Sequence, residues 1–187
     1  GKVPAALLLD SQVKNQLPAT AQAQAAKLTE GVALPKVDRQ NMIADRLNRF
    51  LRHGGDAARG RVVFQQTCLA CHQKGGAGGT VGPQLDGLAS RGAARLVEDI
   101  LDPNRNVDVA FRYTTVKLKS GQVILGLKRR EVGKAIVFAD LTGREVNVPK
   151  ADIATQTQTM RSLMPDTLGV LLNQNDFSHL LQFLLAK

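Results

Sequence analysis

Apolar residues recur every three or four positions in several stretches of the chain, the spacing that places them on one face of an α-helix. One stretch follows Asp38, a residue type that often caps the start of a helix, and ends at Gly54, a residue type common just beyond helix ends. A second follows Asp56 and covers residues 57–66, and a shorter one covers residues 19–28. The side chains expected to be buried by the helix over residues 57–66 are Val62, Val63 and Phe64.

Two further helices are expected later in the chain. The first covers residues 91–101 and ends at Asp102-Pro103, because the residue before a proline disfavours helical backbone angles. The second lies after Pro165 at the C-terminal end, with Asn175 or Asp176 as its cap. The side chains expected to be buried are Leu96, Val97, Ile100 and Leu101 in the first, and Phe177, Leu180, Leu181 and Leu184 in the second.

Between these two helices the apolar spacing changes to every second position, which is typical of β-strands. Residues 113–119 alternate in this way, residues 122–127 continue beyond a Ser-Gly turn, and two short strands are expected at 135–138 and 145–148. The pattern predicts a β-rich insertion over about residues 112–149. We therefore expect a mainly α fold that carries a small antiparallel β insertion.

Composition adds a strong positive charge to this picture. Lys and Arg total 25 against 16 Asp and Glu, and the net charge of +9 favours acidic partners. Seven basic residues and one acid, Glu131, fall between Arg112 and Lys134. We expect this run to be either a solvated face or a docking surface for an acidic partner protein. Tyr113 is the only aromatic residue in the run, which disfavours nucleic-acid binding, and no apolar run is long enough to predict a transmembrane segment.

The two cysteines of the chain both lie in one five-residue motif, Cys68-Leu69-Ala70-Cys71-His72. Residues three and four positions apart lie on one side of a helical turn, so two thiols and one imidazole can face the same ligand. This spacing is the attachment motif of c-type haem, in which the thiols bind the porphyrin and the histidine binds the iron. The glycine-rich segment 74–90 that follows can pass close to a flat ligand, because it lacks bulky side chains.

Three other interpretations of the motif compete with haem attachment. A thioredoxin-like redox pair needs a βαβ setting, whereas a helix is expected before this motif and a glycine-rich loop after it. A zinc site needs a fourth ligand, for which His53 or His179 would have to serve. The third interpretation is an inert buried cysteine pair. We favour covalent attachment of one haem c, with zinc as the next alternative.

A six-coordinate haem iron needs a second axial ligand. The candidates in the sequence are Met42, Met160, Met164, His53 and His179. Met42 lies on an apolar helix face, where a methionine is usually a core residue, and His179 is expected to be a surface or capping residue. Met164 lies in a loop that Pro165 stiffens, which suits a ligand held against iron. We therefore predict His72 and Met164 as the iron ligands, a pair that raises the haem potential and closes the sixth site.

Several segments together resemble a monohaem cytochrome c domain. They are Gly55-Asp56-Ala57-Ala58-Arg59-Gly60-Arg61-Val62-Val63-Phe64, the Cys68-to-His72 motif, Gly82-Pro83-Gln84-Leu85 and the closing helix. The resemblance implies a cytochrome c fold in which Gly60 and Phe64 pack against the last helix near Leu180 and Phe183. It also implies that the Pro83 carbonyl accepts the Nδ1 proton of His72, which would orient the imidazole.

A narrower set of motifs is similar to the planctomycete/verrucomicrobial-type haem-binding domain. These motifs are Gly82-Pro83-Gln84-Leu85-Asp86-Gly87-Leu88, Ile100-Leu101-Asp102-Pro103-Asn104, Gly121-Gln122 and Ser162-Leu163-Met164-Pro165. The resemblance covers about residues 55–187 and places the β insertion between the third helix and the Met164 loop. Residues 1–54 are then expected to be a helical extension or the tail of a preceding domain.

The function expected from these motifs is electron transfer rather than enzymatic turnover. A His/Met-ligated haem would carry electrons from a dehydrogenase to a downstream acceptor, and an acidic-faced redox partner would dock near the haem edge or the basic β insertion. The alternative is a haem enzyme or a gas or redox sensor with an open sixth site. Because this type of haem is attached outside the cytoplasm, the resemblance implies a periplasmic or other extracytoplasmic location.

Overall fold

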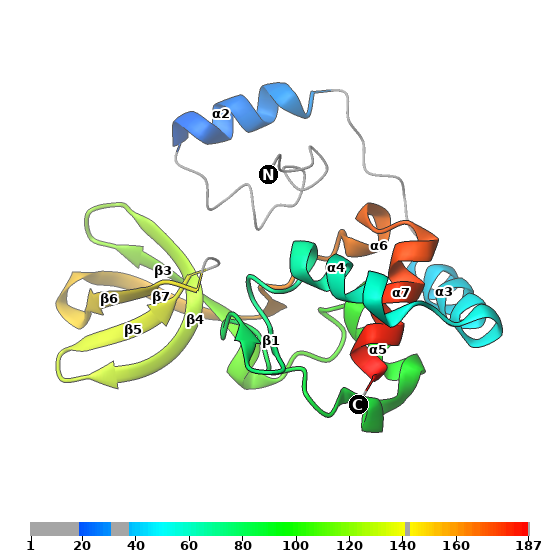
Figure 1. Ribbon diagram of the computed structural model, residues 1–187. Helices are drawn as coiled ribbons and strands as arrows, with labels where there is room; N and C mark the ends of the chain where they lie inside the picture. Colours follow the sequence, from blue (N-terminus) through cyan, green and yellow to red (C-terminus); the bar gives the residue numbers. More distant parts are fainter. Residues whose placement is uncertain (1–18, 31–37, 141–142, 187) are drawn as a thin grey trace.

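The computed structural model describes residues 19–30, 38–140 and 143–186, which form a helical body and a curved β-sheet beside it (Figure 1). Among the described helices, none has both the length and the apolar character needed to cross a bilayer. The helices are α2 (Ala19–Leu28), α3 (Arg39–His53), α4 (Ala57–Thr67), α5 (Gly92–Leu101), α6 (Leu168–Leu171) and α7 (Gln174–Leu185). The strands are β1 (Gln73–Lys74), β2 (Ala77–Gly78), β3 (Arg112–Leu118), β4 (Val123–Val132), β5 (Ala135–Ala139), β6 (Glu145–Pro149) and β7 (Ile153–Ser162).

The helix starts predicted for α3 and α4 are confirmed. The Asp38 side chain accepts a hydrogen bond from the Asn41 amide, and the Asp56 side chain accepts from the amides of Ala58 and Arg59. These bonds satisfy amide groups that have no partner within the helix. The chain leaves α3 at Gly54, whose φ of 63° lies in a region that glycine adopts without strain.

The two helices that flank the sheet also agree with the sequence, with one difference at a cap. All eight apolar side chains predicted to be buried in α5 and α7 are buried. The cap of α7, however, is Asn173 and not Asn175 or Asp176: its side chain accepts hydrogen bonds from both of those amides. In α4, Val63 and Phe64 are buried as predicted, but Val62 is 50% exposed, because it lies on the side of the helix that faces away from the core.

The β insertion is larger than the sequence pattern indicated. Five antiparallel strands pair in the order β6-β5-β4-β3-β7 between α5 and the Met164 loop, so the fold is mixed α and β rather than mainly α. The four predicted strands are present as β3 to β6. The edge strand β7 was not predicted, because most of its residues are exposed and polar and give no apolar alternation. Its addition extends the sheet to Ser162, two residues before Met164.

Three apolar clusters lie within residues 38–140 and 143–186. The largest lies among α3, α4, α5, α6 and α7, and it includes Phe50 from α3. A second lies within the sheet around Phe138 and Val116. The third consists of Val81, Leu127 and Leu163, with Cys71, Phe111 and Tyr113 packed against it. This third cluster is the junction between the sheet and the loops that follow the Cys-x-x-Cys-His motif.

The N-terminal part of the chain is described only in sections. Residues 1–18 and 31–37 lie outside the described residues, and α2 occupies the stretch where a short helix was predicted. The division of the chain into an extension over residues 1–54 and a domain over residues 55–187 stays a prediction.

Candidate haem-binding site

The Cys-x-x-Cys-His motif begins where α4 ends. Cys68 is the C-cap of α4, and its carbonyl accepts hydrogen bonds from the amides of Cys71, at 3.1 Å, and His72, at 2.9 Å. The backbone therefore makes one further tight turn after the helix. This turn brings the two thiols and the imidazole into one short segment fixed to α4.

The side chains of Cys68 and Cys71 are both partly buried. Burial, together with the neighbouring Cys71 sulfur, raises the pKa of Cys68 to about 12, and burial raises the pKa of Cys71. A thiolate is therefore disfavoured at both positions at neutral pH. A thioether carries no charge and does not titrate, so conversion of both sulfurs to thioethers suits this environment.

His72 is held in the form that a metal ligand requires. Its Nδ1 lies 2.9 Å from the Pro83 carbonyl oxygen, as the resemblance implied. A carbonyl only accepts hydrogen bonds, so Nδ1 carries the proton and Nε2 keeps a free lone pair. Burial lowers the pKa of His72, partly opposed by the bond to Pro83, and the neutral imidazole is favoured. A neutral imidazole with a free Nε2 lone pair is the form that can bind a haem iron.

The glycine-rich loop after the motif lies directly against the His72 ring. A Cβ atom on Gly82 would lie 2.7 Å from Nδ1 and 2.9 Å from Nε2 of this ring, closer than packed atoms approach. Backbone bonds fix the loop in place: the Gly79 amide donates to Leu69, the Gly82 amide to Cys71 and the Leu85 amide to Gln73, each at 2.8 Å. Glycine is needed here for close approach to the imidazole itself, whereas the sequence suggested only a flat ligand.

Met164 lies in the loop after β7. Its amide donates to the Ser162 hydroxyl at 3.0 Å, and its partly buried side chain packs against the helical core. The preceding residue, Leu163, is buried beside Val81, two positions before Pro83. The structure thus brings the Met164 loop and the loop that holds His72 to the same apolar cluster.

The other four candidate ligands have different surroundings. Met42 packs against Gly169 beside the helical core, and Met160 is 67% exposed next to Arg112. His53 is exposed at the end of α3. The Nδ1 atom of His179 accepts a hydrogen bond from the Asp56 amide at 2.9 Å, so His179 is a capping residue of α4.

This site contains a contributor that the sequence did not reveal. Arg129, on β4, donates hydrogen bonds from one guanidinium nitrogen to the carbonyl of Thr80 and, at 3.1 Å, to that of Val81. In the sequence it is one of three consecutive basic residues with no distinguishing signal. Only the bend of β4 brings it to this loop.

Neither a zinc site nor a thioredoxin-like redox pair finds support in the described geometry. Across residues 19–30, 38–140 and 143–186, no group of three or more His, Cys, Asp or Glu side chains is arranged to hold a metal ion, and His179 is engaged elsewhere. The motif follows a helix and precedes the two-residue strand β1, so it is not in a βαβ setting. The donor set that remains fits haem c: two thiols, one neutral imidazole and a methionine loop nearby.

Comparison with known proteins supports a haem site at the Cys-x-x-Cys-His motif. The cytochrome c family matches residues 57–124, from the first residue of α4 into β4. No curated protein matches the chain. The family implies covalently bound haem c and haem-based electron transfer. Residues 57–124, which include α4, the Cys-x-x-Cys-His motif and α5, therefore match a cytochrome c domain.

Proposed function

We propose that this chain is an electron-transfer protein or module whose haem c is bound through Cys68 and Cys71, with His72 and Met164 as the axial ligands. The observation that carries the proposal is the 2.9 Å hydrogen bond from His72 Nδ1 to the Pro83 carbonyl, which leaves Nε2 free to bind iron. A bound haem c supplies one-electron chemistry by cycling between ferric and ferrous iron. The protein's part is to hold the ligands in place through both states.

Two features support Met164 as the second ligand. Ser162 fixes the amide of Met164, and Pro165 restricts the backbone that follows it. Leu163 anchors the loop to Val81 and Leu127, so the loop does not depend on the haem for its position. A methionine held in this way closes the sixth site and favours electron transfer over oxygen chemistry.

Replacing Met164 with alanine tests the ligand assignment. In the ferric wild-type protein we expect a low-spin spectrum with the weak near-infrared sulfur-to-iron band, and in Met164→Ala we expect loss of that band and a high-spin spectrum. Met160→Ala is the matched control and should leave the spectrum unchanged, since Met160 is exposed. A high-spin wild-type spectrum without the band would instead support the alternative of a haem enzyme or sensor with an open sixth site.

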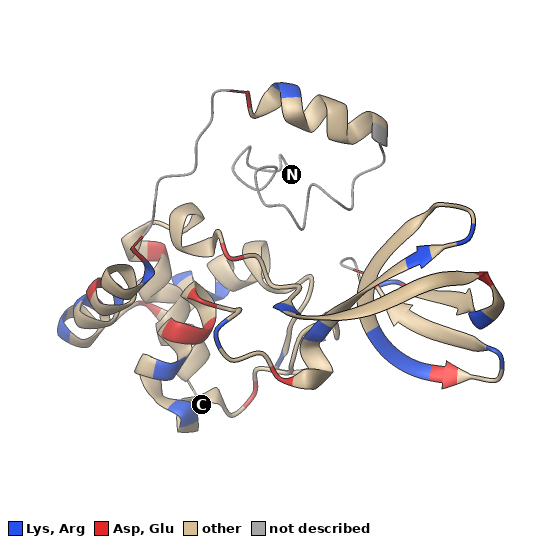
Figure 2. Ribbon diagram, turned by 180° about the vertical axis from the view of Figure 1, so that it is seen from behind, with Lys and Arg blue, Asp and Glu red and all other residues tan. Residues whose placement is uncertain are grey.

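We propose that the redox partner carries an acidic face. Ion pairing already neutralises part of the basic run: Lys128 and Lys150 contact Glu131, whose pKa they lower to about 2, and Arg130 contacts Glu145 at 2.6 Å. Within the described residues, Lys117, Lys119 and Lys134 have no ion-pair partner. Basic residues lie along the curved strand β4 and near the ends of other strands of the sheet (Figure 2).

Stopped-flow reduction by an acidic donor protein tests this docking surface. The rate is expected to fall as salt rises, because screening removes long-range attraction between the two charged faces. The double variant Lys117→Gln/Lys119→Gln should weaken the dependence of the rate on salt. Arg144→Gln should weaken it less, because the positive charge of Arg144 is offset by Asp140 at 3.5 Å. A wild-type rate independent of salt would exclude electrostatic docking.

The subtype and the cellular location are also part of the proposal. We propose the planctomycete/verrucomicrobial type from the resemblance of the sequence motifs. In the structure, two of those motifs are connected by a hydrogen bond that the Ser162 amide donates to the Asn104 side chain at 3.0 Å. Cytochromes c are typically extracytoplasmic, and we propose the periplasm for this one. Its electron donor would be a dehydrogenase, on the same or a separate polypeptide.

A further inference from the structure

The strand β4 bends where it meets the helical body, and one residue marks the bend. In the pairing of β4 with β5, Lys128 lies opposite Phe138 and Arg130 lies opposite Val137, so Arg129 is an extra, unpaired residue on β4. Such a β-bulge bends its strand and redirects a side chain. The middle of β4 accordingly bows toward the helices (Figure 1), and this is where the Arg129 guanidinium meets the glycine-rich loop.

The two carbonyls that Arg129 holds come just before the residues that contact His72. Thr80 and Val81 accept from its guanidinium, Gly82 lies against the imidazole, and the Pro83 carbonyl accepts the Nδ1 proton. Because the four residues are consecutive, movement of the first pair shifts the second. A bond from a charged donor to a carbonyl is stronger than one between neutral groups.

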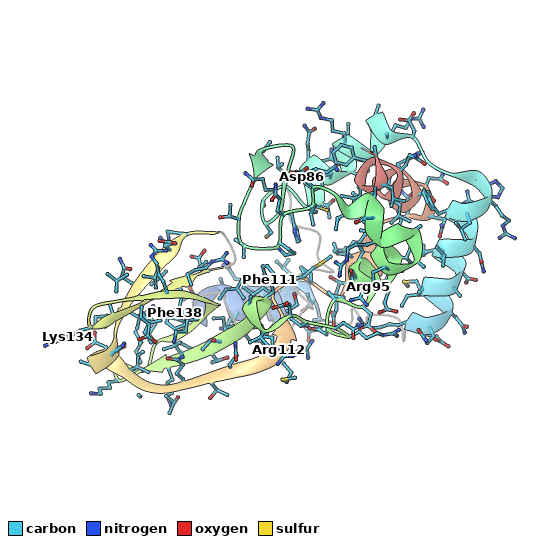
Figure 3. All side chains as sticks on the ribbon, turned by 90° about the horizontal axis from the view of Figure 1, so that it is seen from below. Asp86, Arg95, Phe111, Arg112, Lys134 and Phe138 are labelled. Carbon is cyan, nitrogen blue, oxygen red and sulfur yellow. The ribbon has the colours of Figure 1, made fainter. Side chains whose placement is uncertain are left out.

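Apolar packing supports the same contact from the sheet side. Leu127, two residues before Arg129, is 2% exposed and lies in the cluster with Val81 and Leu163. Phe111, the residue just before β3, packs against this cluster at the end of the sheet nearest the helical body, while Lys134 lies at the opposite end (Figure 3). The sheet therefore contacts the loop through both an aliphatic side chain and a guanidinium.

We propose that Arg129 is a positioning residue for the haem ligand His72, and that the inserted sheet serves to hold the Thr80-to-Pro83 segment in place. The proposal deepens the proposed function, on which it rests. It gives the inserted sheet a role within the haem site itself, separate from any docking of partners.

The test compares two variants that remove the same charge from adjacent residues of β4. Arg129→Gln removes the bonds to Thr80 and Val81, whereas Arg130→Gln removes an exposed pair with Glu145. Hydrogen exchange is followed in the haem-loaded protein for residues 79–85. In this segment the amides of Gly79 and Gly82 are bonded to the motif, and the Leu85 amide is bonded to Gln73, the residue after it. We expect about tenfold faster exchange in this segment for Arg129→Gln, from the loss of a charged hydrogen bond, and wild-type exchange for Arg130→Gln.

A second readout reports on His72 directly. In the reduced protein, the Nδ1 proton of His72 is expected to shift in its NMR resonance and to exchange faster in Arg129→Gln alone, which a general loss of stability would not produce selectively. Wild-type behaviour of this proton and of residues 79–85 in Arg129→Gln would overturn the proposal. Where that variant yields no haem-loaded protein, Arg129→Lys is measured in its place: its shorter reach predicts faster exchange, and unchanged exchange overturns the proposal.

Met164 ligation and the positioning role of Arg129 are tested by separate measurements. A wild-type spectrum without the sulfur-to-iron band contradicts Met164 ligation, yet the exchange of residues 79–85 still decides the role of Arg129. Conversely, a normal spectrum with unaltered exchange in Arg129→Gln keeps the proposed function and removes the positioning role.

Discussion

Replacing both Cys68 and Cys71 with alanine is expected to abolish covalent haem attachment. The two sulfurs are the only cysteine sulfurs in the chain, and both lie in the turn that also carries His72. Without them, no thioether bond can form, and haem would be held by iron ligation and packing alone. The measurement is intact mass after denaturation, for protein matured in a host that attaches c-type haem: the double variant should have the mass of the bare polypeptide.

Ala70→Ser provides the matched control, because it alters the same turn at an exposed position and keeps both thiols. It should retain one covalent haem. Covalent haem in the double variant would show that attachment occurs elsewhere and would contradict the site.

The second large effect is expected from Gly60→Ala. In an ordinary helix this change stabilises by about 1 kcal/mol, because alanine is the better helix former. Gly60, however, is where α4 crosses α7, and a Cβ there would lie 2.7 Å from the Phe183 Cβ and closer still to the His179 carbonyl. The helices would have to separate, so we expect a net destabilisation of about 3 kcal/mol, measured by denaturant unfolding of the haem-loaded protein.

Whether Gly60→Ala stabilises or destabilises the protein shows whether α4 and α7 are in close contact at this position. Arg61→Ala, on an exposed position of the same helix, should change the free energy of unfolding by no more than about 0.5 kcal/mol. A stabilising Gly60→Ala would mean that α4 and α7 do not make this close contact. The contact between the rings of Phe64 and Phe183, with centroids 5.4 Å apart, depends on the same crossing.

Features that depend on local chemistry could be predicted from the sequence. The caps at Asp38 and Asp56 and the stop at Gly54 follow from what short polar side chains and glycine do at helix ends. The cap of α7 was misplaced because Asn173 precedes the apolar stripe by four residues and has two equally suitable neighbours after it. The preference of certain residue types for helix caps limits the cap of α7 to a few positions, but it does not decide among them.

Features that depend on tertiary contacts could not be predicted from the sequence. The strand β7 has six consecutive residues, 153–158, of which five are exposed, so its polar pattern resembles a loop and only its pairing with β3 makes it a strand. Arg129 is indistinguishable from Lys128 and Arg130 in sequence, and it is the β-bulge that aims it at Thr80 and Val81. The bond from His72 to Pro83 spans eleven residues and came from family resemblance.

Covalent haem attachment is tested most directly by the intact mass of the wild-type protein, combined with its pyridine haemochrome spectrum. We expect a mass that exceeds that of the polypeptide by one haem, and a spectrum characteristic of haem bound by two thioether bonds. A mass equal to the bare polypeptide, after maturation in a host competent for c-type cytochromes, would contradict haem attachment at Cys68 and Cys71.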